Sequence, residues 1–202
     1  MMDERLLRAG TIVFDVGNVL LSFEPERVAS LMPAEHRAAL KEAMFGQVHR
    51  WSEFDLGQKP NEQISEEIAK AAGVPGGAEM VLKALYGFPE TMEPLPLYRC
   101  IAELKGLGKR LYTLTNYAEP SFTLTRERFP ALKELDGEAV SSREKLCKPD
   151  REFYRRLIER YGIDPAESLF IDDREENVRA GAEVGFRVWH YTDGDLVIDS
   201  AS

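Results

Sequence analysis

Short apolar runs that end in a polar residue recur along the chain. The runs are TIVFD (11–15), RLYTLTN (110–116), SLFIDD (168–173) and FRVWHY (186–191), with EAVSS (138–142) as a shorter candidate. Parallel strands that are buried on both faces show this pattern. Between them lie amphipathic helical patterns, such as the stretch 149–162, which ends on a glycine. Strands alternating with helices predict an α/β fold, a Rossmann-like doubly wound parallel sheet with right-handed crossovers.

Residues 23–94 break this alternation. They contain no convincing strand, but they carry helical patterns that glycine and proline residues separate, at 34–46, 48–56, 61–72 and 77–86. We therefore predict a small α-helical cap inserted after the first strand, with residues 1–22 and 95–202 forming the catalytic core. The linkers at 22–25 and 88–94 would let such a cap open and close.

Length and charge narrow the class of protein. The chain has 202 residues and a formal net charge of −9, which argues against nucleic acid or an anionic membrane as its main partner. No apolar run approaches the roughly 18 residues of a membrane span, and the first ten residues lack the core of a signal peptide. We expect a cytoplasmic protein, either a monomer or a homodimer. Cys100 and Cys147 are too far apart for a close-spaced zinc motif and are expected to be reduced thiols.

Polar side chains follow the predicted strands where each strand ends. They are Asp15 after the first strand, Thr115 and Asn116 after the second, Lys148 after the weak third candidate, and Asp172 with Asp173 after the fourth. The carboxyl ends of parallel strands meet at one edge of a sheet, so these groups should lie together. Three carboxylates cannot remain ionised side by side without a cation. Mg²⁺ prefers such oxygen ligands, and the sequence therefore predicts a magnesium site.

Each of these residues also has a plainer interpretation when it is taken alone. Asp15 suits a turn, Asp172 and Asp173 suit the start of the following helix, and Lys148 suits the surface. Their order and their positions after strands favour the functional interpretation. The segments FDVGNVL, YTLTN, CKPD and FIDDREEN resemble the four motifs of the haloacid dehalogenase-like hydrolases. Most members of that superfamily are magnesium-dependent phosphatases that act through a phospho-aspartate.

This resemblance covers essentially the whole chain, including the helical cap. The DxGNVL form and the small cap look most like the branch that contains bacterial glucose-1-phosphate phosphatases and the N-terminal phosphatase domain of soluble epoxide hydrolases. The resemblance implies that Asp15 is the nucleophile and that Mg²⁺ is the cofactor. The implied metal ligands are Asp15, the main-chain carbonyl of Gly17 and Asp173, with Asp172 in support.

The resemblance also implies how a small-molecule phosphate is bound. Thr115 and the backbone amide of Asn116 would hold phosphate oxygens, and the main-chain N–H groups from Gly17 to Asn18 would add to the cradle. Lys148 would balance the charge shared by the phosphate and Asp15.

Gly17 departs from the commoner pattern of the superfamily. There, the residue two positions after the nucleophile is a second aspartate, which protonates the leaving oxygen. Such general acid help is typically worth about 10²–10⁴-fold in rate. Its loss favours an activated substrate, such as an anomeric sugar phosphate or an acyl phosphate. Glu24 is a candidate substitute acid, although it also suits a linker or a helix cap.

The predicted cap should select the substrate. His49 and Trp51 in HRWSEFDLG (49–57) either face the substrate or pack inside the cap, whereas Phe54 suits the interior of the cap. The expected function is a magnesium-dependent phosphatase of a small organic phosphate. One alternative is a non-catalytic binding protein that has lost the general acid. The other is a metal-free haloacid dehalogenase, which the uncompensated carboxylates of Asp172 and Asp173 disfavour.

Overall fold

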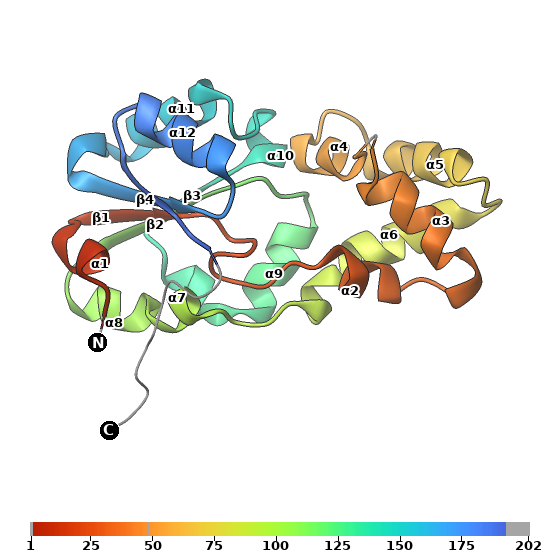
Figure 1. Cartoon of the computed structure of the whole chain (residues 1–202), viewed down its shortest axis with the longest axis horizontal. Coiled ribbons are helices and arrows are strands. Elements are labelled where there is room, and N and C mark those ends of the chain that lie inside the picture. The colour runs from red at the N-terminus through yellow and green to blue at the C-terminus, as the bar shows by residue number, and fades with distance from the viewer. Residues whose placement is uncertain (1, 48, 193–202) are drawn as a thin grey trace.

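A single five-stranded parallel sheet forms the centre of the molecule in the computed structural model, which describes residues 2–47 and 49–192 (Figure 1). The strands are β1 (Thr11–Phe14), β2 (Arg110–Thr115), β3 (Gly137–Val140), β4 (Ser168–Asp172) and β5 (Arg187–His190). Their order in the sheet is β3-β2-β1-β4-β5, and every neighbouring pair is parallel. The predicted strands are therefore confirmed. β3 ends earlier than expected, because Ser141 and Ser142 begin a short helix.

Helices cover both faces of this sheet (Figure 1). On one face lie α11 (Arg151–Tyr161) and α12 (Glu175–Glu183), whose apolar side chains pack with those of Val13 and Phe170. On the other face lie α1 (Glu4–Arg8), α7 (Pro96–Arg99), α8 (Ile101–Gly106) and α9 (Ser121–Arg128), against Ile12 and Phe14. Val13 and Phe14 point to opposite faces because side chains alternate along a strand. The layers confirm the predicted doubly wound α/β fold.

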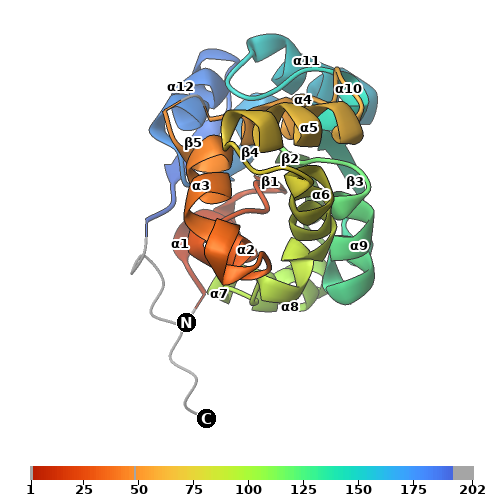
Figure 2. The ribbon, with the colours of Figure 1, turned by 90° about the vertical axis from the view of Figure 1, so that its right-hand side faces the viewer.

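The part of the chain between β1 and α7 forms a group of helices at one end of the sheet, called here the helical insertion (Figures 1 and 2). Its helices are α2 (Pro25–Ser30), α3 (Ala34–Phe45), α4 (Trp51–Leu56), α5 (Asn61–Ala71) and α6 (Gly77–Gly87), followed by the 3₁₀ turn η1 (Phe88–Thr91). Four of these helices match the predicted ones within a few residues, and α2 was not predicted. The apolar core of the helical insertion continues into the core on one face of the sheet. Among the described residues, no helix is long and apolar enough to cross a membrane.

The two connections of the helical insertion run beside each other. The amide of Ser22 donates to the carbonyl of Glu93 at 2.9 Å, and the amide of Leu95 donates to that of Leu20 at 2.9 Å. Leu21 and Pro94 form an antiparallel bridge between these two bonds. The chain thus leaves and re-enters the sheet layer at one place. Whether residues 23–94 move as a separate cap stays a prediction.

Candidate active site

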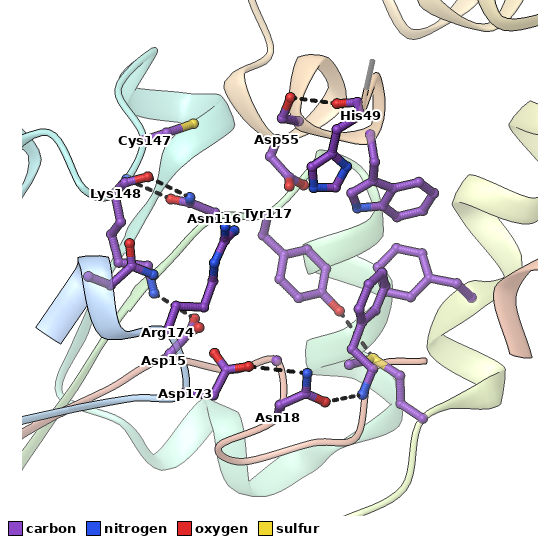
Figure 3. A pocket seen from close by; sticks show the side chains of 17 residues that line it. Asp15, Asn18, His49, Asp55, Asn116, Tyr117, Cys147, Lys148, Asp173 and Arg174 are labelled. Carbon is purple, nitrogen blue, oxygen red and sulfur yellow. Dashed lines mark hydrogen bonds and ion pairs between the residues drawn. The ribbon is translucent and has the colours of Figure 1, made fainter. Parts of the chain in front are cut away.

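A cavity of about 330 Å³ lies between the carboxyl ends of the strands and helix α4 (Figure 3). This volume is within the range of sites for small ligands. Its lining includes most of the residues that the sequence indicated: Asp15, Gly17, Asn18, Asn116, Lys148 and Asp173 from the side of the sheet, and His49 and Trp51 from the helical insertion. The structure therefore brings together residues that lie more than a hundred positions apart in the sequence.

Asp15 is held in place by the turn that follows β1. Its amide donates to the carbonyl of Ile171 at 2.9 Å, and the carbonyl of Val16 then accepts from the amides of Leu20 and Leu21. Asn18 has a φ of 55°, a left-handed conformation that asparagine tolerates better than most residues. Its side chain accepts a hydrogen bond from the amide of Phe23 at 2.8 Å and donates to Asp173 at 3.3 Å. The VGN sequence thus sets the turn and links it to the end of β4.

Lys148 joins two of the carboxylates. Its ammonium nitrogen lies 2.9 Å from Asp15 Oδ1 and 2.6 Å from Asp172 Oδ2, and the side chain is almost completely buried. Burial alone would lower the pKa of Lys148, but the charges of Asp15 and Asp172 outweigh it and raise that pKa above its usual value. A surface position for Lys148, the plainer interpretation of the sequence, is therefore wrong.

Asp15, Asp172 and Asp173 bring carboxylate oxygens within 4.8 Å of one another. Burial raises the pKa of Asp15 and that of Asp173, and the charge of Asp172 raises both further; Lys148 opposes the rise at Asp15. One ammonium group does not neutralise three carboxylates, so the donor set fits a divalent cation with oxygen ligands.

The three carboxylates are not equivalent. Asp172 is fully buried, and it accepts hydrogen bonds from Lys148 Nζ, from the amide of Arg174 and from Asn177 Nδ2. Asp173 is only partly buried and lines the cavity. Asp15 and Asp173 are therefore better placed to bind a cation directly, and Asp172 is better placed to orient Lys148.

Thr115 ends β2 and is buried, and its hydroxyl has no hydrogen-bond partner among the described residues. A buried hydroxyl without a partner costs free energy, which a bound oxyanion would recover. Thr115 lies next to Asn116, which lines the cavity. Thr115 itself does not line the cavity, and a phosphate contact at the end of β2 stays a prediction.

The structure separates Glu24 from the other candidates. Glu24 precedes α2, its side chain is 54% exposed, and its carboxylate lies 3.2 Å from Arg27 Nε. It does not line the cavity. Glu24 therefore fits the other interpretation of the sequence, a linker glutamate, and is not placed to act as the substitute acid.

Aromatic rings form the side of the cavity that faces the helical insertion. The ring of Trp51 lies 5.7 Å from that of Phe23 and 5.4 Å from that of Phe88, and all three line the cavity. Trp51 packs inside the insertion and also borders the cavity, whereas contact of its ring with a substrate stays a prediction. His49 lines the cavity as well, whereas Phe54 is fully buried elsewhere, as expected.

Two charged residues that line the cavity were missed from the sequence, Asp55 and Arg174. Asp55 lies four positions after Trp51 on α4, so the two share one face of the helix; that spacing could have identified it. Burial and the charge of Asp15 raise the pKa of Asp55 to about 7, against the opposing charges of Lys148 and Arg174. Arg174 directly follows Asp173 and pairs with Glu176 at 2.6 Å.

The chain is similar to several known proteins. The chain is 29% identical over 188 residues to the sesquiterpene phosphatase astK of Aspergillus oryzae, a match that covers 90% of this chain and 89% of that protein. A HAD family enzyme of Bacteroides thetaiotaomicron, solved in complex with magnesium and inorganic phosphate, superimposes with a TM-score of 0.77 at 20% identity, covering 94% of this chain and 98% of that one.

The L-2-haloacid dehalogenase of Xanthobacter autotrophicus superimposes with a TM-score of 0.67 at 20% identity, covering 89% of this chain and 76% of that one. At such identities these two structures establish the fold alone. The model of one family, haloacid dehalogenase-like hydrolase, matches residues 9–185. The chain therefore belongs to the haloacid dehalogenase-like hydrolases.

Proposed function

We propose that this hydrolase is a magnesium-dependent phosphatase that cleaves a small organic phosphate through a phospho-aspartate on Asp15. The observation that carries the proposal is the cluster at the strand ends, where Lys148 contacts both Asp15 and Asp172 and Asp173 faces the cavity. Phosphoryl transfer asks a protein mainly for positioning and for neutralisation of charge. The sesquiterpene phosphatase of Aspergillus oryzae, which aligns over 90% of this chain, supports the same reaction class.

The residues of the cluster fit the cofactor. Asp15, the main-chain carbonyl of Gly17 and Asp173 would hold Mg²⁺, and Asp172 would support them. When bound, the ion would neutralise charge between the carboxylates and the phosphate and would polarise a phosphate oxygen. The Thr115 hydroxyl and the Asn116 amide would bind phosphate oxygens.

Asp15 supplies the nucleophile in this proposal. One of its carboxylate oxygens attacks phosphorus, and the bond from phosphorus to the organic oxygen breaks. Lys148 stays beside Asp15 throughout and offsets the negative charge that gathers there. Water then releases phosphate from Asp15 and restores the carboxylate.

The aromatic side of the cavity indicates what the phosphate is attached to. Phe23, Trp51 and Phe88 offer ring faces that favour an apolar group over one that is rich in hydroxyls. We therefore infer that the organic part has an apolar face, as a prenyl group has. The resemblance to glucose-1-phosphate phosphatases instead suggested a sugar phosphate, so both kinds of substrate are compared in the test below.

Residues 23–94 would act as the cap that closes over this substrate. Both sides of the cavity contribute residues to its lining, so a bound substrate would be enclosed between them. Opening at the adjacent linkers would admit the substrate and release the products.

The test is phosphate release from a panel of glucose 1-phosphate, farnesyl phosphate, acetyl phosphate and p-nitrophenyl phosphate, with Mg²⁺ and with EDTA. We expect turnover that EDTA and Asp15→Asn both abolish. Asp164→Asn is the matched control, because Asp164 is exposed and caps a turn outside the cavity. Halide release from 2-haloacids that persists in EDTA would favour a dehalogenase. No turnover above the Asp15→Asn level on any substrate would favour a non-catalytic protein.

A further inference from the structure

The position two residues after Asp15 has room for a side chain but carries none. A Cβ built on Gly17 would meet only the Cβ of Phe23, at 3.8 Å, which is ordinary contact. The backbone of Gly17 does not adopt the left-handed conformation that would require glycine. Packing and backbone strain therefore do not explain the glycine, and an acid for the leaving group has to come from another element.

Asp55 lines the cavity with a carboxyl group that is not part of the carboxylate cluster at the strand ends. Among the described residues, the lining contains the carboxyl groups of Asp15, Asp173 and Asp55. The first two belong to the cluster at the strand ends. Asp55 belongs to α4, and its carboxyl group points into the cavity from the opposite side (Figure 3). A phosphate on Asp15 would therefore have its organic oxygen turned towards the side from which Asp55 approaches.

The end of α4 that carries Asp55 is fixed to the core. Ser141 Oγ, just after β3, donates to the main-chain carbonyl of Asp55 at 2.5 Å. Gly57 packs so closely on Ser142 that a Cβ at position 57 would lie 2.9 Å from its backbone. Lys145 Nζ also donates to the carbonyl of Gly57. These contacts hold Asp55 at one position relative to the sheet.

The surroundings of Asp55 favour a proton on its carboxyl group near neutral pH. Burial and the charge of Asp15 raise its pKa to about 7. The charges that act the other way are those of Lys148 and Arg174. The remaining titratable groups that face this part of the cavity are His49, Tyr117, Cys147 and Asp173. A group with a pKa near the working pH can both donate and accept a proton.

We propose that Asp55 is the general acid and base of this enzyme, in place of the aspartate that the superfamily commonly has at the position of Gly17. The inference rests on the proposed phosphatase function. As Asp15 attacks phosphorus, the electron pair of the breaking bond goes to the organic oxygen, which takes the proton of Asp55 and leaves as an alcohol. Asp55, now a carboxylate, then takes a proton from water while the water oxygen attacks phosphorus. The bond to Asp15 breaks, and inorganic phosphate and protonated Asp55 result.

The test compares leaving groups. Asp55→Asn should lower kcat/KM for an alkyl phosphate by about 10²–10⁴-fold, but should lower it less than about tenfold for p-nitrophenyl phosphate, whose leaving group needs little protonation. The ratio of the two rates does not depend on how much of the variant is folded. Glu53→Gln is the matched control, since Glu53 lies on the same helix, pairs with Arg50 and Lys59 and does not line the cavity. It should leave the ratio unchanged.

A rescue variant makes the test sharper. Gly17→Asp combined with Asp55→Asn would place an acid at the position that the structure leaves open. This double variant should have a kcat/KM for the alkyl phosphate at least tenfold higher than that of Asp55→Asn alone. If Asp55→Asn slows all leaving groups equally and Gly17→Asp restores nothing, the assignment of Asp55 is wrong, while turnover that depends on Asp15 would still support the phosphatase. Absence of any turnover that depends on Asp15 would instead overturn the proposed function.

Discussion

Asn116 holds the main chain of Lys148 from both sides. Its Nδ2 donates to the carbonyl of Lys148 at 3.0 Å, and its Oδ1 accepts from the amide of the same residue at 2.8 Å. The ammonium group of Lys148 is thereby fixed between Asp15 and Asp172. The side chain of Asn116 thus positions Lys148, a role separate from the phosphate contact predicted for its backbone amide.

Asn116→Ala should therefore impair catalysis through Lys148. Loss of two hydrogen bonds costs about 1–3 kcal/mol of stability, and displacement of the ammonium group should lower kcat/KM at least tenfold. The control is Asp136→Ala, which removes a side chain that binds the Leu111 amide and Lys105 at the other end of β2. It should lower the melting temperature without a comparable loss of kcat/KM. An equal loss of kcat/KM in both variants would contradict the positioning role.

The sequence was sufficient to predict the sheet and one side of the site. Runs such as TIVFD are long enough and apolar enough to indicate strands, and parallel strands bring their ends together wherever they lie in the chain. Asp15, Lys148 and Asp173 could thus be placed at one edge from the strand pattern. The strand pattern alone does not distinguish Asp172 from Asp173; the family resemblance implied that Asp173 is the metal ligand and Asp172 its support. The fold adds the physical reason, because it is Asp172 that is saturated with hydrogen bonds.

The side of the site formed by the helical insertion was harder to predict. Its helices carry polar residues on several faces, and only their packing on the sheet decides which face borders the cavity. Glu24 was a candidate acid because it lies just past the first strand, although it also suited a linker, and the structure pairs it with Arg27 outside the cavity. Asp55 is forty positions away, and the contact of α4 with the helix after β3 brings it there.

Magnesium should stabilise the fold measurably. Asp15, Asp172 and Asp173 repel one another without a cation, and a ligand at 100 times its dissociation constant adds about 2.7 kcal/mol to the free energy of unfolding. For a chain of this size that is a rise of roughly 5–10 °C in melting temperature. Thermal unfolding with MgCl₂ and with NaCl at equal ionic strength measures it. Asp173→Asn should lose the rise; a rise of the same size in that variant would place the ion elsewhere.

Phe23 should contribute to the choice of substrate. It is partly buried, lines the cavity and lies against Trp51 and Phe88. Phe23→Leu removes ring contacts worth about 0.5–1.5 kcal/mol, so the ratio of kcat/KM for farnesyl phosphate to that for acetyl phosphate should fall about 2- to 10-fold. The control is Phe129→Leu, because the ring of Phe129 packs on Tyr98 outside the cavity. This control should leave the ratio unchanged. If Phe23→Leu does not alter the ratio, the aromatic side of the cavity does not bind the organic part of the substrate.

Gly57 should be required for the position of Asp55. A Cβ at Gly57 would lie 2.9 Å from Ser142, and the residue has a φ of 62°. Gly73 has a similar φ of 67° with nothing within 4 Å, so Gly73→Ala carries the same backbone cost of about 1–2 kcal/mol without the clash. Gly57→Ala should therefore lower kcat/KM for an alkyl phosphate at least tenfold more than Gly73→Ala does. Equal rates in the two variants would show that this contact does not position α4.

Asp55 should also make the stability of the protein depend on pH. Its pKa is about 7 in the folded chain, and its usual value is 3.8. The folded state therefore binds the proton more tightly, and the contribution of Asp55 to stability is fully present below pH 4 and is lost as pH rises through 7. Asn carries no charge in this range, so Asp55→Asn should be more stable than the wild type at neutral pH.

The measurement is the melting temperature of both proteins in EDTA between pH 4 and pH 8. The melting temperature of the variant should exceed that of the wild type by about 2–4 °C for each kcal/mol of stability that the ionised Asp55 costs the wild type. This difference in melting temperature should grow as pH rises from 4 to 7. Other carboxylates, including Asp15, titrate in both proteins, so the difference between the two curves isolates Asp55. A difference that does not change with pH would mean that Asp55 is ionised in the folded protein near its usual pKa, and it could not then donate a proton to the leaving group at neutral pH.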